Sequence, residues 1–527
     1  MNSTNLIIDA NFPGGAIGNV EFAGTHRIDF SAPKNGSPRS LWYYFRLRGG
    51  KGERITFEQR ELEDVLGVLE SRTYALTDPV IKHGDGGEWQ RIDTNNVSFD
   101  RNPLGYSFSI VPETDTTYIA FSFPYTFSNL ESFLRGAGDG SPISLDSIGK
   151  TAEGRDFPMM IVGDQAERNQ SCCIVTARHH AGEVSGSYVL EGMIDAYLTG
   201  REEQGLSRLL LLVFPFVDLD GVESGRYGKD RPPVDFNRDW TAEPEHQEIR
   251  LIQRRIKEYA QRHKLLFYAD LHAPQPGGTT YIVPARAASS SSDNYRRLWE
   301  FANAFEENVS GVSTCRVEDL DPDAINWGGE HYQHNSVQYH AREYGIPALC
   351  LETTYHYDSD LKLLNPTVWR QVGRCFGRTV FDGFYLQKED SKGRSVRVSS
   401  RERVWDFWEM VSAPVDAELT ERNKSMILES SESGEAFITF RRYMAKEEEC
   451  RVKVDSRLAE KNFMMRLVTY FYRGRTVFGP LRSVQALVEP GVCELVPGTD
   501  IDCLEYTSYR IGVGIKGLKG SLTVTID

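Results

Sequence analysis

Short apolar runs and amphipathic stretches alternate between residues 136 and 386, and this alternation restricts the fold more than any other feature. A buried parallel strand reads as a continuous apolar run, whereas a surface helix repeats apolar residues every three or four positions. The apolar runs are 172–177, 208–216, 265–272 and 346–352, and the helical stretches are 189–197, 249–259 (with Thr241 as the N-cap), 295–309 and 368–385. The pattern predicts an α/β domain whose sheet is covered by helices on both faces.

The regions on either side of this domain read as β structure. Residues 1–135 contain short runs rich in aromatic and β-branched residues, separated by glycine turns, and predict a small β-sandwich without a clear helix. A charged stretch at 387–394 predicts a linker. Strand-like runs return in 395–527, where we expect a β-rich accessory domain. The expected organisation is therefore a β-sandwich (1–135), an α/β domain (136–386) and a C-terminal β-rich domain (395–527).

Charge and cysteine usage narrow the function classes. The net charge of −15 argues against a nucleic-acid binder, which needs a basic face, and gives no support to an anionic membrane as partner. We find no leader-like N-terminus and no apolar run long enough to cross a membrane. The eight cysteines form no Cys-x-x-Cys pair and several lie in apolar runs, so we expect reduced thiols in a cytoplasmic protein.

A His-x-x-Glu pattern formed by His180 and Glu183 follows the apolar run 172–177 and precedes a helical stretch. The carboxyl end of a strand is where open α/β sheets bind ligands, and a spacing of three places both side chains on one face of a helical turn. An imidazole and a carboxylate placed in this way can share one metal ion. By itself the pattern is weak, because a chain of this length contains it about once by chance.

Four further motifs follow in a fixed order and make the signal specific. They are an Asp-Gly-Val turn at 220–222, the pair Asn237-Arg238, an expected strand that ends in Asp270-Leu271-His272, and Glu352 at the end of the next strand. In this order the five motifs resemble those of the zinc metallocarboxypeptidases, also called funnelins.

The N-terminal region resembles one branch of that family. The segments 15–20, 42–46, 88–91 and 123–127 are similar to the β-sandwich that precedes the catalytic domain in cytosolic carboxypeptidases. The resemblance covers roughly residues 10–385 and not the segment from 395 onward. It implies a catalytic domain with a mixed, largely parallel sheet between helices.

The resemblance also implies a role for each motif. His180, Glu183 and His272 correspond to the ligands of one zinc ion, which leave a fourth position open for water. Glu352 corresponds to the general base, although a glutamate at a strand end can also cap the next element. His179, next to His180, is expected to be structural. Asp270 either orients an imidazole or points to the surface.

Substrate contacts follow from the same correspondence. Asn237 and Arg238 resemble the pair that binds the free C-terminal carboxylate, although Arg238 could instead form a surface ion pair. A second arginine of the family stabilises the oxyanion, and its candidates are Arg231, which we favour, and Arg226. In the cytosolic branch this arginine follows the tyrosine matched by Tyr227, where this chain has Gly228. The tyrosine that closes on substrate is expected to be Tyr332 or, as the alternative, Tyr339.

The sequence therefore predicts a zinc-dependent carboxypeptidase that hydrolyses the last peptide bond of a peptide or protein tail. Two alternatives stay open at this point. One is a zinc amidohydrolase that deacylates small N-acyl amino acids on the same fold. The other is a peptide-binding protein whose catalytic site has decayed.

Overall fold

The computed structural model divides into two compact units, Met1–Gln387 and Lys388–Asp527. It describes residues 6–62, 77–101, 104–138, 140–165, 169–203, 206–285, 289–316, 333–358, 362–386 and, beyond these, the strands of the second unit. The boundary that we predict at 135/136, inside the first unit, stays a prediction.

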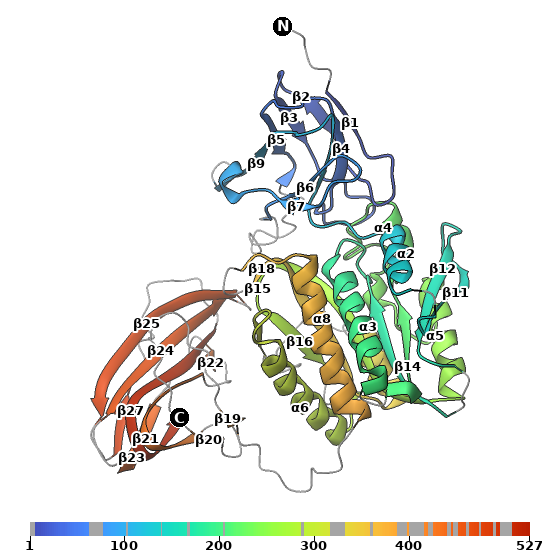
Figure 1. Cartoon of the computed structure of the whole chain (residues 1–527). Coiled ribbons are helices and arrows are strands. Elements are labelled where there is room, and N and C mark those ends of the chain that lie inside the picture. The colour runs from blue at the N-terminus through green and yellow to red at the C-terminus, as the bar shows by residue number, and fades with distance from the viewer. Residues whose placement is uncertain are drawn as a thin grey trace. The chain divides into compact units, whose positions relative to one another are not determined.

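The first unit begins with two five-stranded sheets (Figure 1). One has the order β1 (Ile7–Asp9), β4 (Tyr44–Arg48), β10 (Thr116–Ala120), β6 (Val80–His83) and β7 (Gln90–Arg91). The other has the order β2 (Val20–Phe22), β3 (Arg27–Phe30), β5 (Ile55–Gln59), β9 (Leu104–Ile110) and β8 (Val97–Arg101).

Aromatic side chains join the two sheets. Phe45 of β4 contacts Phe30 of β3 and Phe57 of β5, each at 5.5 Å between ring centroids. Phe57 in turn stacks on Phe108 of β9 at 5.2 Å. These buried rings come from alternate positions of the strands, and this confirms a β-rich N-terminal region. The expectation that this region lacks a helix is wrong, because α2 spans Phe127–Gly136 and has a capping box at Thr126.

An eight-stranded mixed sheet forms the rest of the first unit. Its order is β11 (Ile143–Lys150), β12 (Asp156–Val162), β14 (Leu209–Phe214), β13 (Ser171–Ala177), β15 (Lys264–Gly278), β18 (Ala348–Asp358), β16 (Thr280–Pro284) and β17 (Cys315–Arg316). The four central strands β14, β13, β15 and β18 pair in parallel, whereas β12 and β16 run antiparallel to their central neighbours. The predicted α/β class with a mixed sheet is confirmed.

Helices cover both faces of this sheet. They are α3 (Ser185–Glu203), the short α4 (Leu219–Glu223), α5 (Gln247–Ala260), α6 (Ser292–Val309), α7 (Ser336–Tyr344) and α8 (Pro366–Val380), which continues as a π-helical turn through Phe381–Tyr385. Neighbouring residues of a strand point to opposite faces. On β15, Phe267 packs against Phe301 of α6 and against Phe384, while Tyr268 stacks on His340 of α7 at 3.7 Å. The helices α6 and α7 therefore lie on opposite faces.

Two glycines let α3 and α8 approach closely, and Figure 1 shows these helices side by side. A Cβ atom at Gly192 would lie 2.0 Å from the carbonyl oxygen of Arg370, and one at Gly373 would lie 2.0 Å from that of Val189. Any larger residue would push the helices apart. The close pair fixes α3, whose N-terminus directly follows the loop with the expected metal motif.

The expected N-cap at Thr241 is wrong. Helix α5 begins later, at Gln247, with His246 as its N-cap. The backbone N–H groups of Glu245 and His246 donate to the Asp239 carboxylate at 2.9 and 2.7 Å. This carboxylate satisfies the donors just before the helix, so the chain between Thr241 and Pro244 does not need to be helical.

A buried polar cluster links the sandwich to the mixed sheet. The Asp78 carboxylate accepts hydrogen bonds from Thr94 Oγ1 at 2.6 Å and from His356 Nε2 at 3.2 Å. Arg91 donates to the backbone oxygens of Asp78 and Tyr355 at 2.7 and 3.1 Å. Although burial raises the pKa of Asp78, the hydrogen bonds from His356 and Thr94 and the nearby positive charges hold it below its usual range.

Replacing Asp78 with asparagine is expected to lower the free energy of unfolding by about 1–3 kcal/mol at neutral pH, because the hydrogen bonds go to a buried charge. A depressed pKa stabilises the fold above the unfolded pKa of about 3.9, and this contribution is lost as pH falls through the folded pKa. The difference between wild type and variant should therefore narrow in acid. Urea unfolding at stepwise lower pH measures it. The exposed Asp382, changed to asparagine, is the control, and equal effects of the two changes would contradict the prediction.

The second unit is described only through its strands, which form one β-sheet. Their path is β19 (Val398–Ser399), β20 (Asp416–Leu419), β21 (Ser425–Thr439), β27 (Ser508–Ile526), β23 (Val452–Ala459) and β26 (Val492–Leu495), with β22 (Met444–Ala445) on β27 and the pair β24 (Phe463–Arg473) and β25 (Thr476–Val488) beside it. Within the described residues of the whole chain, every helix is too short or too polar to span a membrane.

Candidate active site

The predicted site residues come together at the carboxyl end of β13, where β15 and β18 continue beyond it to Gly278 and Asp358. The prediction that these two strands end at His272 and Glu352 is therefore wrong. After β13 ends at Ala177, a loop carries His180 and Glu183 to the start of α3. On the neighbouring strands β15 and β18, His272 and Glu352 are register partners. Parallel strands deliver their carboxyl ends to one edge of a sheet, which is the edge where such sheets bind ligands.

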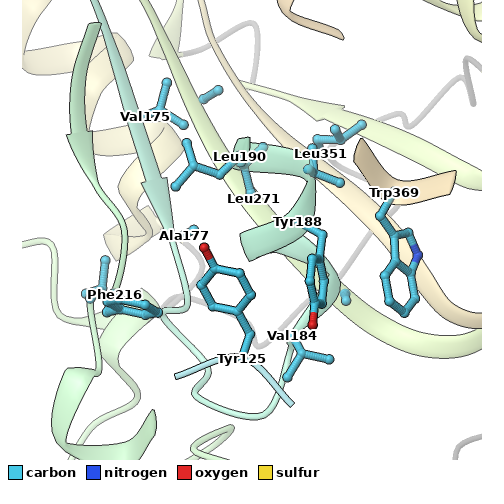
Figure 2. Packing of buried hydrophobic residues seen from close by; sticks show 14 of the residues in the cluster. Tyr125, Val175, Ala177, Val184, Tyr188, Leu190, Phe216, Leu271, Leu351 and Trp369 are labelled. Carbon is cyan, nitrogen blue, oxygen red and sulfur yellow. The ribbon is translucent and has the colours of Figure 1, made fainter. Parts of the chain in front are cut away.

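A buried cation and an apolar layer support the loop. Arg178, with φ of 61°, donates to the carbonyl oxygens of Ala181 and Tyr125 and to Ser187 Oγ. Figure 2 shows the apolar layer around these segments, which includes Val175 and Ala177 from β13, Leu271 from β15, Leu351 from β18, and Val184, Tyr188 and Leu190 around the start of α3. Because these side chains are fully packed, the loop has little freedom to move its histidines.

Three side chains form a compact candidate metal site. The Glu183 carboxylate lies between two imidazoles, with Oε1 at 2.8 Å from His180 Nδ1 and Oε2 at 2.8 Å from His272 Nδ1. The candidate ligand atoms of the three residues all lie within 4.8 Å of one another, and all three residues are buried. The structure thus brings together the three residues for which the sequence predicts a zinc ion.

The second nitrogen of each imidazole faces another carboxylate. His180 Nε2 is 3.2 Å from Asp235 Oδ1, and His272 Nε2 is 2.8 Å from Asp270 Oδ2. A carboxylate behind a histidine fixes the ring and its tautomer, so that the other nitrogen presents a lone pair to a metal. Asp270 does orient an imidazole, as one of our two sequence interpretations has it.

The number of protons that the two imidazoles can carry indicates that a cation binds here. A neutral imidazole carries one N–H, yet both nitrogens of His180 and of His272 face carboxylate oxygens. Burial lowers the pKa of His272, but the charges of Asp270 and Glu183 outweigh it and raise that pKa well above its usual range. A divalent ion beside Glu183 would supply the positive charge and leave both rings neutral. Imidazole and carboxylate donors in this number suit zinc.

A second group of potential ligands lies behind the first. His179, Asp270 and His272 also hold their ligand atoms within 4.8 Å of one another. In that group His179 Nε2 already accepts a hydrogen bond from Trp240 Nε1 at 3.0 Å. Asp270 accepts further hydrogen bonds from Thr176 Oγ1, His179 Nδ1, Ser336 Oγ and Asn237 Nδ2. Because His179 and Asp270 of this group already have these hydrogen-bond partners, His180, Glu183 and His272 are the better candidates for the metal.

Glu352 completes the buried cluster. Within the part of the chain that the structure describes, its Oε2 atom is buried and has no hydrogen-bond partner. Burial raises the pKa of this carboxyl above its usual range, while the charges of His272 and Lys229 oppose the shift. An unpaired buried carboxylate oxygen costs stability, and it suits a group that must accept a proton from a bound molecule.

Asn237 and Arg238 lie in a single 3-10 turn, Phe236–Arg238, capped by Asp235. The Asn237 amide donates to Asp270 Oδ2 at 3.1 Å and accepts from the Ser336 backbone N–H at 3.0 Å. Arg238 is partly exposed and donates to the carbonyl oxygen of Asn237 at 2.8 Å. Asn237 thus belongs to the network behind His272, while Arg238 is partly exposed.

The remaining predicted residues lie in different settings. Arg231 Nη1 is 3.5 Å from Asp218 Oδ1, and Arg226 donates to Glu153 at 2.6 Å. The ring of Tyr339 lies 5.5 Å from the ring of Trp240, between centroids, and this contact supports a packing role for Tyr339. Tyr332 lies outside the described residues.

Sequence reasoning missed three polar residues of this site. They are Asp235 behind His180, Ser336 on Asp270, and Lys229, whose Nζ is 3.7 Å from Glu183 Oε1. Asp235 could have been found, because an aspartate just before a short polar turn is a common cap. Ser336 and Lys229 show no pattern in the sequence that separates them from other polar residues.

Two family models match this chain. Residues 137–358 match the zinc carboxypeptidase model, and residues 8–122 match the model of the cytosolic carboxypeptidase N-terminal domain. The two matches follow each other without overlap, as a sandwich followed by a catalytic domain would.

Curated relatives point to the same family. Cytosolic carboxypeptidase 6 of Caenorhabditis elegans is 23% identical over 321 residues, which cover 56% of this chain and 68% of the relative. Cytosolic carboxypeptidase 6 of Homo sapiens is 24% identical over 293 residues, which cover 51% of this chain and 57% of the relative. The chain therefore spans between about half and two thirds of the length of these relatives.

Solved structures share the fold. A metallo-carboxypeptidase from Burkholderia cenocepacia superposes with a TM-score of 0.58 at 21% identity, covering 71% of this chain and 98% of that one. A metallo-carboxypeptidase from Pseudomonas aeruginosa, in complex with (2-guanidinoethylmercapto)succinic acid, gives a TM-score of 0.58 at 19% identity, covering 71% and 98%.

Proposed function

This chain belongs to the zinc carboxypeptidase family, and from that premise we propose that it hydrolyses the C-terminal peptide bond of peptides or protein tails in the cytoplasm. The observation that carries the proposal is the unpaired Glu352 oxygen beside His180, Glu183 and His272. A decayed site has no reason to keep a buried base without a partner, since such a group only costs stability. We find no observation that favours deacylation of small N-acyl amino acids.

The metal and the base divide the work in this proposal. His180, Glu183 and His272 would hold one zinc ion, which would supply the Lewis acidity needed to activate water near neutral pH. Asp235 and Asp270 keep the two imidazoles in place. Glu352 takes a proton from the attacking water and passes it to the nitrogen of the leaving amine. Its raised pKa helps the second transfer, because a carboxylate of higher pKa holds the proton longer.

Recognition of the substrate rests on Arg238, with Asn237 beside it. The planar guanidinium can form two parallel hydrogen bonds to a carboxylate. Arg238 stands next to the turn cap Asp235, which itself faces His180, so a carboxylate bound there would lie close to the metal site. An internal peptide bond presents no carboxylate, so the product would be one free amino acid.

Three substrates test the proposal against its alternatives. The zinc-loaded protein should release an amino acid from a peptide with a free C-terminus. It should act on neither the same peptide as its C-terminal amide nor an N-acetyl amino acid, with amino acid release measured by mass spectrometry. Preferred hydrolysis of the N-acetyl compound would favour the deacylase, and binding of the peptide without release would favour the decayed site.

Replacing Arg238 with methionine is expected to weaken kcat/KM for the free-acid peptide by about 10- to 100-fold, the value of a lost charge-assisted hydrogen-bond pair. Lysine at this position keeps the charge and loses the fork, so it should recover only part of the loss. Steady-state kinetics measure both. Unchanged kcat/KM in the methionine variant would place the carboxylate elsewhere.

A further inference from the structure

Lys229 is a cation that reaches from the surface into the metal site. Its Nζ atom lies 3.7 Å from Glu183 Oε1, while 22% of the Lys229 side chain and 1% of the Glu183 side chain are exposed. Its charge also favours the ionised form of Glu352. The ammonium group is thus near both a candidate metal ligand and the candidate base, and its side chain is partly exposed.

The backbone explains why this cation comes from position 229. Gly228 has a φ of +89°, which favours glycine, and a Cβ atom there would lie 2.7 Å from the Ala181 backbone nitrogen. Ala181 directly follows the candidate ligand His180, so this contact has no room to relax. With this backbone, position 228 excludes any side chain. The next residue is the first that can direct a positive charge into the site.

The two arginines of the same loop are directed elsewhere. Arg226 pairs with Glu153 at 2.6 Å. Arg231 faces the buried Asp218, which caps α4, and its guanidinium lies 5.8 Å from the centre of the Phe236 ring. Lys229 therefore has the stronger geometric claim to the oxyanion role that the sequence analysis gave to Arg231.

We propose that Lys229 is a catalytic residue whose Nζ–H donates a hydrogen bond to the carbonyl oxygen of the scissile peptide bond. This inference rests on the proposed carboxypeptidase function. As the water oxygen bonds to the carbonyl carbon, the C=O π electrons move to that oxygen, and the nearby ammonium stabilises the charge. When the oxygen re-forms its double bond, the C–N bond breaks. Both water protons end on the released amine, one of them through Glu352, and Lys229 keeps its own.

The N-terminal sandwich holds the backbone of this lysine. Ser37 Oγ donates to the Lys229 carbonyl oxygen at 2.6 Å, and Arg39 Nε donates to Asp230 Oδ2 at 2.6 Å. Asn35 Nδ2 donates to the Gly225 carbonyl oxygen at 3.3 Å. The loop 225–230 is thus tied to the sandwich at three points. We assign Ser37 and Arg39 as positioning residues that act through Lys229.

The test compares three methionine variants in the full-length zinc-loaded chain. Lys229→Met should lower kcat by about 10²- to 10³-fold, the effect of removing one oxyanion donor, with KM and zinc content nearly unchanged. Arg231→Met should keep kcat close to that of wild type. So should the control Lys257→Met, which changes an exposed lysine of α5. Lys229→Arg should recover part of the loss. A peptide phosphonate, whose tetrahedral anion resembles the charged transition state, should bind Lys229→Met more weakly by a comparable factor.

Arg39→Met tests the positioning role. It should lower kcat in the wild-type background and have no further effect in the Lys229→Met background, because the effects of residues that act through one group do not add. Additive losses would show a merely structural role.

Several results overturn the assignment. Unchanged kcat in Lys229→Met would remove the catalytic role, even if the wild type is a carboxypeptidase. A change in zinc affinity alone would show that Lys229 only neutralises Glu183. If wild type neither cleaves peptides nor binds the phosphonate, the proposed function and this inference both fail.

Discussion

Replacing Glu352 with glutamine is expected to lower kcat by about 10²- to 10⁴-fold, the contribution of a well-placed general acid–base group. Glutamine fills nearly the same volume but cannot take a proton from water. The three candidate zinc ligands are untouched, so the variant should bind one zinc ion per chain. Steady-state kinetics on a free-acid peptide, together with metal analysis of the same samples, measure both quantities.

Stability separates this effect from damage to the fold. Since burial raises the pKa of Glu352, the ionised carboxylate destabilises the folded state at neutral pH. The uncharged glutamine should therefore unfold at the same temperature as wild type or at a higher one. Glu131, which is exposed on α2, provides the matched change to glutamine, and its kcat should stay unchanged. A Glu352→Gln protein that retains most of its turnover at full zinc content would exclude this residue as the base.

The second large effect is expected on zinc binding, where substitutions of the adjacent residues His179 and His180 should differ. His180→Asn is expected to lose zinc almost completely, because an amide is a poor ligand for this metal and only Glu183 and His272 remain. His179→Asn should retain zinc, since His179 contacts Asp270 and Trp240 and its amide replacement can still donate to Asp270. Activity should follow the metal in both variants, and chelation of zinc from wild type should reproduce the loss.

Competition with a zinc chelator, followed by metal analysis, measures the affinity of each variant. Asp270→Asn calibrates the scale, because loss of a carboxylate behind a metal ligand weakens metal binding by about 10- to 100-fold. His180→Asn should exceed that effect. Loss of zinc from His179→Asn with retention in His180→Asn would instead assign the metal to the group formed by His179, Asp270 and His272.

The strongest structural predictions rested on local regularities. The apolar run that became β14 is buried at every position, and the apolar residues that became α3 recur at helical spacing, so each pattern indicates the type of element. Motif order singled out His180, Glu183, His272 and Glu352 as candidates, because the first two follow the apolar run of β13 and the last two lie in the apolar runs of β15 and β18. The predicted start of α5 was wrong. Asp239, which lies outside the helix, accepts hydrogen bonds from the backbone N–H groups of Glu245 and His246, just before the helix begins.

The sequence by itself determined the α/β class, the β-rich N-terminal region and the set of side chains able to hold zinc, because hydrophobic period and residue chemistry are local properties. Only the tertiary structure decided which nitrogen of each imidazole faces Glu183, that Asp235 stands behind His180, and that Lys229 points at the cluster while Arg231 faces Asp218. Each of these findings concerns the direction in which a side chain points. They depend on the backbone at Gly228 and on packing between segments distant in the chain, which no local pattern encodes.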